Sequence, residues 1–201
     1  HEQKIPLIGG IFVLAMIIKI YPSENYLFYT IFFGIFFIGI LSDAKLISSP
    51  KLRLILQLLI VSFFIYSYDI EVTPTRIDTF DLILENKFLS IFFSIFCFMI
   101  LVNGSNFIDG LNGLLLGYLT IVILILFKLN FNDLIFFDNE AQIITFTIIL
   151  FILTFNFSNQ LFVGDNGAYS LGFIIGVFLI KIYNLNNVIS PYFVILLLWY
   201  P

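Results

Sequence analysis

The chain has 201 residues, of which 61% are hydrophobic and 11% are charged, and its formal net charge is −4. Soluble domains carry about 25% charged residues, and a soluble chain this short has too little interior to bury so much apolar surface. The negative charge argues against a nucleic-acid partner. The single cysteine, Cys97, excludes an intrachain disulfide and is read as a small hydrophobic residue. Residues 1–201 are therefore predicted to form one integral membrane domain.

Apolar stretches alternate with short polar breaks along the chain. All six prolines fall at the breaks or at the ends, where a missing N–H group matters least. Several stretches are shorter than the ~20 residues of a usual bilayer crossing, so either these boundaries are too narrow or some helices are tilted or partly embedded. We predict an all-α, polytopic bundle of about eight transmembrane helices, over Ile8–Tyr21, Tyr26–Leu41, Lys51–Tyr66, Lys87–Val102, Leu111–Lys128, Ala141–Asn156, Gly167–Ile182 and Val188–Tyr200.

Two further features concern packing and the membrane surface. The longest break, Ser67–Asn86, mixes apolar residues with acids and predicts a hairpin followed by a short amphipathic helix on the membrane surface. Gly113 and Gly117, like Gly172 and Gly176, have the spacing that lets helices approach closely. We interpret both pairs as packing glycines.

Four segments have unusual polar content, and two predicted spans separate each from the next: His1–Gly10, Ser42–Pro50, Asn103–Asn112 and Asn159–Gly167. Counting spans therefore predicts that all four lie on the same side of the membrane. Lysines and arginines are divided almost evenly between the two sides, so the positive-inside rule does not decide which side is cytoplasmic.

The third segment carries a row of polar side chains. Asn103, Asn106, Asp109 and Asn112 follow one another at intervals of three residues, which on a helix gathers side chains into a stripe. Carboxylate and amide oxygens are the ligands that Mg²⁺ takes, usually shared with substrate phosphates. Polar groups at membrane depth are costly and indicate function by default.

The other three segments hold acids, bases and glycines. Asp165 precedes a span at a prospective helix start, where free N–H groups favour anions, and Asp43 and Lys45 end the second span. Gly9 and Gly10 open the first span and suit close backbone approach. Taken singly, each acid is most simply a helix cap, and Lys4 and Lys45 are solvated. Their expected convergence on one face favours a shared active site.

These motifs together resemble a known family. The order Pro-Leu-Ile-Gly-Gly at 6–10, Ser-Asp-x-Lys at 42–45, Asn-x-x-Asn-x-x-Asp-Gly-x-Asn-Gly-Leu at 103–114 and Phe-x-Gly-Asp-x-Gly at 162–167 is similar to that of the polyprenyl-phosphate N-acetylhexosamine-1-phosphate transferases (glycosyltransferase family 4). The resemblance covers essentially the whole chain. It is nearer to the GlcNAc-1-phosphate branch than to the phospho-MurNAc-pentapeptide branch, because of residues 1–10 and because the first motif lacks Thr-Pro-Thr.

The resemblance implies an enzyme with two substrates. It would transfer N-acetylhexosamine 1-phosphate from a UDP-sugar such as UDP-GlcNAc to undecaprenyl phosphate, releasing UMP, with Mg²⁺ (or Mn²⁺) as cofactor. The active site would face the cytoplasm from the lipid bilayer of the bacterial inner membrane, with a homodimer as a candidate assembly. The product would initiate a cell-envelope polysaccharide, such as cell-wall precursor or the O-antigen of lipopolysaccharide.

The resemblance also implies residue roles. Asp165 would be the principal Mg²⁺ ligand with Asn106 beside it. Asp43 would belong to an acidic pair associated with the lipid phosphate, and Asp109 would line the nucleotide pocket; Asp43, Asp109 and Asp165 are thus the expected catalytic residues. The expected substrate-binding residues are Lys4, Gly9, Lys45, Asn103 and Asn112.

Several departures from the family pattern leave alternatives open. Ser42 replaces the first acid of the pair, and Asn112 stands where many bacterial members have Asp. We expect the family's His-rich motif to follow Pro201 and a further helix to precede His1, so the chain should be an inactive fragment on its own. The alternatives are a transporter or ion-coupled carrier, whose intramembrane acids and broken helices look similar, and a catalytically inactive family member.

Overall fold

The computed structural model describes residues 6–20, 26–72, 74–128, 139–185 and 189–192. Within these ranges the chain is helical and contains no strand, which confirms the all-α prediction. The helices are α1 (Gly9–Ile20), α2 (Tyr26–Asp43), α3 (Pro50–Tyr68), α4 (Asp78–Leu84), α5 (Lys87–Ile108), α6 (Leu114–Lys128), α7 (Asn139–Phe157) and α8 (Gly164–Leu185).

Seven of the eight predicted spans correspond to helices of the bundle. Among the described residues, α2, α3, α5 and α8 are each long and apolar enough to cross a membrane. Helix α1 and the described parts of α6 and α7 are shorter and also apolar. Most of the eighth predicted span, Val188–Tyr200, lies outside the described residues. The protein is therefore a polytopic, helical, integral membrane protein, as the composition predicted.

The segment between α3 and α5 contains the predicted short helix, α4. The hairpin predicted before it is wrong for the described residues of that segment. Asp81 accepts hydrogen bonds from the backbone N–H of Thr75 (2.6 Å) and from that of Arg76 (2.9 Å), so these amides bond to a side chain instead of a second strand. Arg76 in turn donates to the carbonyl of Tyr183 at 2.6 Å, which fastens the segment to the far end of α8.

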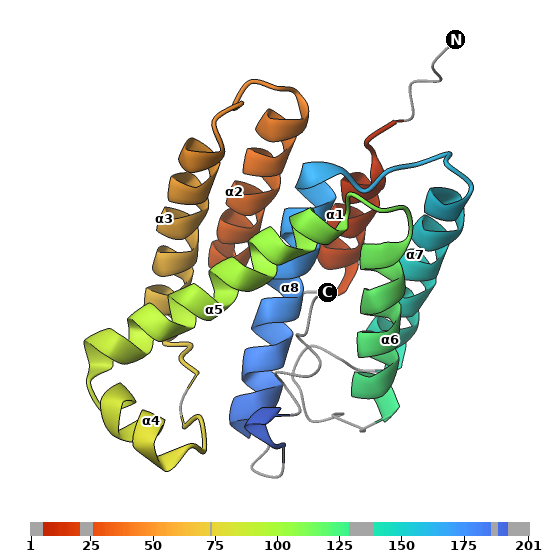
Figure 1. The fold of residues 1–201 in the computed structure, drawn as a ribbon. Helices are drawn as coiled ribbons and strands as arrows, with labels where there is room; N and C mark the ends of the chain where they lie inside the picture. Colours follow the sequence, from red (N-terminus) through yellow and green to blue (C-terminus); the bar gives the residue numbers. More distant parts are fainter. Residues whose placement is uncertain (1–5, 21–25, 73, 129–138, 186–188, 193–201) are drawn as a thin grey trace.

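Helix α8 is the centre of the bundle, with α1, α2 and α5 packed along it (Figure 1). Almost all of its residues are buried. The oblique crossing of α5 over α8 depends on the second predicted glycine pair. A Cβ at Gly172 would lie 2.6 Å from the carbonyl oxygen of Leu101, and one at Gly176 would lie 2.7 Å from the ring of Phe98. The packing role predicted for this pair is confirmed.

The other predicted glycine pair does not join two helices. Gly113 adopts a φ of 76° in the turn before α6, and a Cβ there would lie 2.4 Å from the ring of Phe157. Within the described ranges, no atom lies within 4 Å of the Cβ position of Gly117. The interpretation of this pair as packing glycines is therefore wrong for Gly117, because α6 meets no other backbone at that point.

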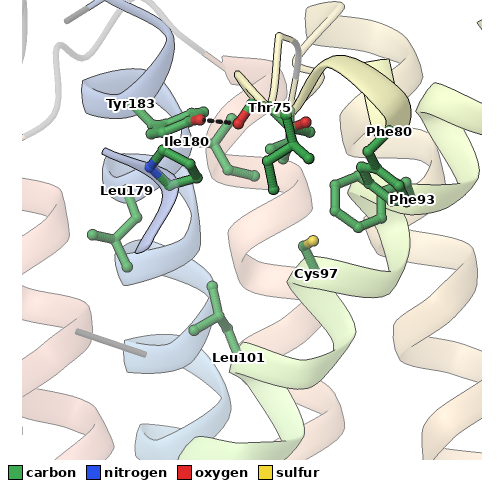
Figure 2. A pocket seen from close by; sticks show the side chains of 11 residues that line it. Thr75, Phe80, Phe93, Cys97, Leu101, Leu179, Ile180 and Tyr183 are labelled. Carbon is green, nitrogen blue, oxygen red and sulfur yellow. Dashed lines mark hydrogen bonds between the residues drawn. The ribbon is translucent and has the colours of Figure 1, made fainter. Parts of the chain in front are cut away.

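An apolar cavity of about 340 Å³ lies between α5, α8 and the α3–α5 segment, at the end of the bundle that carries α4 (Figure 2). Figure 2 shows Cys97 and Leu101 of α5 facing Leu179 of α8 across it, with Tyr183 donating to the Thr75 carbonyl at its edge. None of the described residues that line this cavity is charged. This part of its lining therefore has no group that would neutralise a phosphate.

The crossing of α5 and α8 yields a first prediction. Gly172→Ala should lower the free energy of unfolding by about 1–3 kcal/mol, since the new methyl group would meet the backbone of Leu101 and Val102, which cannot move aside as a flexible side chain could. The measurement is the thermal unfolding midpoint of the protein in detergent micelles. Gly117→Ala is the matched control and should leave the midpoint unchanged or slightly raise it, because alanine favours helix where space is open. An equal loss in both variants would contradict the prediction.

Candidate active site

The described residues of the four polar segments, which for the first segment are 6–10, meet at the end of the bundle opposite α4 (Figure 1). The backbone of residues 6–10 pairs with the segment before α8: Phe162 N–H donates to Pro6 O at 3.1 Å, and Gly9 N–H donates to Phe162 O at 3.0 Å. A Cβ at Gly9 would lie 2.7 Å from the Cα of Val163. The close approach expected of this glycine is therefore real, and it joins the start of α1 to the start of α8.

The first turn of α8 is capped by a residue from another helix. Asp43, the last residue of α2, accepts hydrogen bonds from the backbone N–H groups of Asp165 (2.9 Å) and Asn166 (3.1 Å). It also accepts one from the side-chain amide of Asn166 at 2.6 Å. The first N–H groups of a helix have no partner within it, and the helix dipole favours a negative charge there. Asp43 thus supplies to α8 the cap that the sequence analysis considered for each acid alone.

Asp109 reaches the same helix start from the end of α5. It is the residue that follows the last turn of α5, and the Gly164 N–H hydrogen-bonds its carboxyl group. Burial raises the pKa of Asp109 to about 7, the negative charge of Asp165 adds to this rise, and the Gly164 hydrogen bond opposes it. Three carboxylates, from α2, α5 and α8, therefore surround one helix N-terminus.

Asp165 is paired with a cation that the sequence analysis did not single out. Arg53, in the first turn of α3, donates from Nη1 to Asp165 Oδ2 at 2.8 Å, and both side chains are about three-quarters buried. The same Nη1 lies 2.6 Å from Ser42 Oγ, which itself hydrogen-bonds Asp165 Oδ2. Ser42, standing where the family has an acid, is thus a hydroxyl donor to Asp165.

Tyr169 extends this network toward α5. Its hydroxyl accepts a hydrogen bond from Asn106 Nδ2 at 2.9 Å and lies 3.4 Å from Arg53 Nη1. Tyr169 is one turn after Asp165 on α8, so the two side chains share a face of the helix. The chain of contacts Asn106, Tyr169, Arg53 and Asp165 therefore links α5, α3 and α8 across the end of the bundle.

The remaining predicted residues are only partly brought together. A step of three residues falls about 60° short of a full helical turn, so the predicted stripe winds around the helix. Asn103 donates back to the Met99 carbonyl at 3.0 Å within α5. Helix α5 ends at Ile108, so the continuation of the stripe to Asn112 is wrong; Asn112 lies in the next turn and donates to the Asn159 side chain. Lys45 lies exposed in the turn after α2, and Lys4 lies outside the described residues.

Arg53 and Tyr169 were missed as site residues. The sequence did contain a signal for Arg53, because Arg53 and Gln57 are polar, lie four residues apart and therefore share one face of an otherwise apolar helix. Gln57 is fully buried, which a lipid-facing position would not permit. Tyr169 gave no such signal, since tyrosines are common at span ends.

The family resemblance implies Mg²⁺, whose ligands would be the oxygen-bearing side chains around Asp165. No group of three acids, histidines or cysteines among the described residues forms a ready metal site. One oxygen of Asp165 is shared by Arg53 and Ser42. Mg²⁺ commonly binds one or two carboxylates and takes its other ligands from substrate phosphates and water. Asp165, with the amide of Asn106 in the same network, fits that shared kind of binding and not a self-contained metal centre.

The raised pKa of Asp109 gives a prediction for stability against pH. A carboxyl group whose pKa rises from 3.8 unfolded to about 7 folded holds its proton better in the folded state, so the contribution of Asp109 to stability is greatest below pH 4 and is lost as pH rises through 7. Asp109→Asn removes this titration. The thermal unfolding midpoints of the variant and of the unmodified protein are compared in buffer with a metal chelator. At pH 8 the midpoint of Asp109→Asn should be the higher of the two, and at pH 5 the difference between the two proteins should be smaller. A variant that is less stable at pH 8 would contradict this.

Comparisons with known proteins identify a family and two curated relatives. The sequence model of glycosyl transferase family 4 matches residues 25–183. The phospho-N-acetylmuramoyl-pentapeptide-transferase of Dictyoglomus thermophilum is 27% identical over 187 residues, covering 86% of this chain and 58% of that protein. The enzyme of the same name from Dictyoglomus turgidum is 28% identical over 191 residues, with the same coverages.

The chain thus spans 58% of the length of these two curated relatives. Both are pentapeptide transferases by name, so the nearness to the GlcNAc-1-phosphate branch stays a prediction. The family match includes three of the four polar segments and almost all of the helices that build the site. The chain belongs to glycosyl transferase family 4, the polyprenyl-phosphate N-acetylhexosamine-1-phosphate transferases.

Proposed function

We propose that the protein transfers a sugar 1-phosphate, from a UDP-N-acetylhexosamine, to a membrane polyprenyl phosphate. An oxygen of the lipid phosphate attacks the phosphorus that carries the sugar. The bond between that phosphorus and the bridging oxygen breaks, UMP leaves with the bond's electron pair, and a polyprenyl diphosphate sugar is formed. The attacking phosphate is already ionised at neutral pH, so the step needs charge neutralisation and alignment more than a base.

The observation that carries the proposal is the pairing of Arg53 with Asp165 at the start of α8. A diphosphate donor and a phosphate acceptor repel each other, and the site must offset that repulsion. Arg53 supplies a fixed guanidinium fork suited to phosphate oxygens, and the acids around it supply positions for a cation. Such a network at one end of the bundle supports an interfacial transferase over a carrier, whose site would lie near the bilayer midplane.

Mg²⁺ would be held by Asp165 together with Asn106, and would supply charge neutralisation at the diphosphate when bound. Asp109 lies beside Asp165 and is proposed to line the nucleotide side of the site. Asn103, Asn112, Lys4, Gly9 and Lys45 stay proposals as substrate-binding residues. Of these, Gly9 contributes through the backbone contact that it permits with the start of α8.

The surroundings of the site suit a lipid acceptor. Leu46, Phe107 and Leu111 are large, exposed apolar side chains close to the polar segments. Apolar side chains beside a charged network are appropriate at the membrane interface, where a lipid phosphate is presented while its chain stays in the hydrocarbon. We propose that this end faces the cytoplasm of a bacterial inner membrane, where UDP-sugars are available, and that the product begins a cell-envelope polysaccharide.

The direct test is an assay of the full-length protein in membranes with undecaprenyl phosphate and a panel of UDP-N-acetylhexosamines. UMP release that requires both substrates and a divalent cation is expected. Release of UMP with none of the sugars would refute the proposal. Dependence on Mg²⁺, with Mn²⁺ as the comparison ion, is read from the same assay.

Asp165→Asn should abolish turnover while the protein stays folded, because the amide keeps the hydrogen-bonding shape but loses the charge that a metal ligand needs. UMP release and the thermal unfolding midpoint are measured together. Asp78→Asn is a matched control, since Asp78 is an exposed acid in the first turn of α4, at the other end of the bundle. Near-normal turnover in Asp165→Asn would remove Asp165 from the metal role.

Arg53→Ala should reduce kcat by about 100-fold, a typical loss for one charge-stabilising donor. Arg53→Lys should recover part of the rate, because lysine keeps the charge but not the planar fork. Lys51→Ala removes an exposed cation from the same turn of α3 and should have normal activity. If Lys51→Ala and Arg53→Ala lose activity equally, the effect is one of general surface charge and the assignment of Arg53 is wrong.

A further inference from the structure

The family pattern groups Asp43 with the lipid phosphate, but its carboxylate already has three donors. Oδ1 accepts the Asp165 backbone N–H, and Oδ2 accepts both the backbone N–H and the side-chain amide of Asn166. A carboxylate offers about four acceptor positions, so little capacity remains. A negative group so engaged is also unsuited to receive a phosphate, because nothing in these contacts neutralises the repulsion between the two.

Asp43 is placed by the close packing of its own helix on α8. One turn earlier on α2, a Cβ at Gly39 would lie 2.1 Å from the Cα of Asn166. On the other side, a Cβ at Gly10 of α1 would lie 1.5 Å from the Asn166 side-chain oxygen. The first turn of α8 is therefore held between α1 and α2, with glycines where the backbones approach most closely. In this setting Asp43 is the group that fixes the backbone of Asp165.

Asp165 is the residue on which the position of this turn matters most. Its backbone N–H binds Asp43, while its side chain meets Arg53 and Ser42 on the other side. Gly164, directly before it, has a φ of 75° and no side chain that could cap the helix. Without Asp43, the amides of Asp165 and Asn166 would lose their acceptor, and the direction of the Asp165 carboxylate would no longer be determined by α2.

We infer that Asp43 is a positioning residue, which acts on the reaction through the first turn of α8 by orienting Asp165 and not by contacting the lipid phosphate. This inference rests on the proposed function for its kinetic part. It deepens that proposal by giving different roles to Asp43 and Asp165, which the family pattern treats alike as site residues. The role of Asp43 can be tested because its hydrogen-bond partner is an asparagine, so the side chains at positions 43 and 166 can be swapped.

The test begins with Asp43→Asn in the full-length protein. The variant keeps a carbonyl oxygen that can accept from Asp165 N–H. Its NH₂ group, however, faces the backbone N–H and the side-chain amide of Asn166, which are both donors and can no longer bond to it. We expect kcat to fall about 10-fold to 100-fold, as for other groups that orient a metal ligand. The KM for polyprenyl phosphate should stay within about twofold. A residue that binds the lipid phosphate would instead raise that KM.

The decisive variant is the exchange Asp43→Asn with Asn166→Asp. It restores a side-chain hydrogen bond between the two positions and keeps one negative charge at the start of α8. We expect kcat of the exchanged protein to be about tenfold higher than that of Asp43→Asn. This recovery equals the smallest loss expected from Asp43→Asn alone. Absence of recovery in an exchanged protein that folds, or a KM that rises in Asp43→Asn, would overturn the inference.

Hydrogen exchange measured by mass spectrometry supplies a readout that does not need activity. In Asp43→Asn, the amides of peptides covering 163–170 should exchange about fivefold to tenfold faster, as expected for loss of a helix cap. Unchanged exchange there would overturn the inference even if activity falls. If no UDP-sugar supports turnover, the proposed function fails, whereas exchange still decides whether Asp43 holds this turn.

Asn86→Ala is the matched control. Asn86 caps α5 at the other end of the bundle by accepting hydrogen bonds from the N–H groups of Phe88 (3.0 Å) and Leu89 (3.4 Å). Its loss should speed exchange at the start of α5 and leave kcat unchanged. A comparable fall in kcat in this variant would mean that loss of any cap impairs the enzyme, which would overturn a specific role for Asp43.

Discussion

A helix that begins inside a bundle leaves its first N–H groups without partners, and in α8 these groups bind carboxylates from two other helices. Asp43 comes from α2 and Asp109 from the end of α5. Buried amides must be satisfied, and hydrocarbon offers no water to satisfy them. The same contacts that stabilise the buried helix therefore gather the acids. The position of Asp165, of the Arg53 pair and of the network beyond it all follow from where this helix starts.

Glycines at the helix contacts make this arrangement sterically possible. Gly10 and Gly39 leave room for the first turn of α8, and Gly172 and Gly176 leave room for α5 to cross it further along. Helices in a membrane associate through close packing and polar contacts, because lipid is as apolar as the side chains it would replace. The small residues thus bring the backbones near enough for side chains such as Asp43 to reach across. Packing and chemistry at this end of the bundle depend on the same residues.

The charged network of Arg53 and Asp165 lies at one end of the bundle, where a membrane protein meets water. Arg53 and Asp165 are partly exposed, and Tyr169 and Asn106 continue the network inward. The far end of the bundle is held differently, by Arg76 on the end of α8 and by a salt bridge between Lys87 and Asp69 at 2.8 Å. The apolar cavity of about 340 Å³ at that end has no charged side chain among the described residues that line it. The Arg53–Asp165 network thus lies at one end of the bundle, and the contacts of Arg76 and Lys87 lie at the other.

The sequence by itself determined the helices and the end of the bundle at which the polar segments meet. Hydropathy, proline positions and the counting of spans depend on neighbours along the chain, and within the described residues they predicted seven helices and the end at which the polar segments lie. Tertiary structure alone decided which groups touch. Arg53 and Asp165 are 112 residues apart, and Asp43 and Asp165 are 122 apart. No local pattern specifies such a contact, because it depends on how three helices pack. For the same reason, the pattern of polar residues predicted that Asn112 continues a helical stripe, although α5 ends at Ile108. The spacing of Gly113 and Gly117 likewise predicted a packing contact at Gly117, where no described atom comes near.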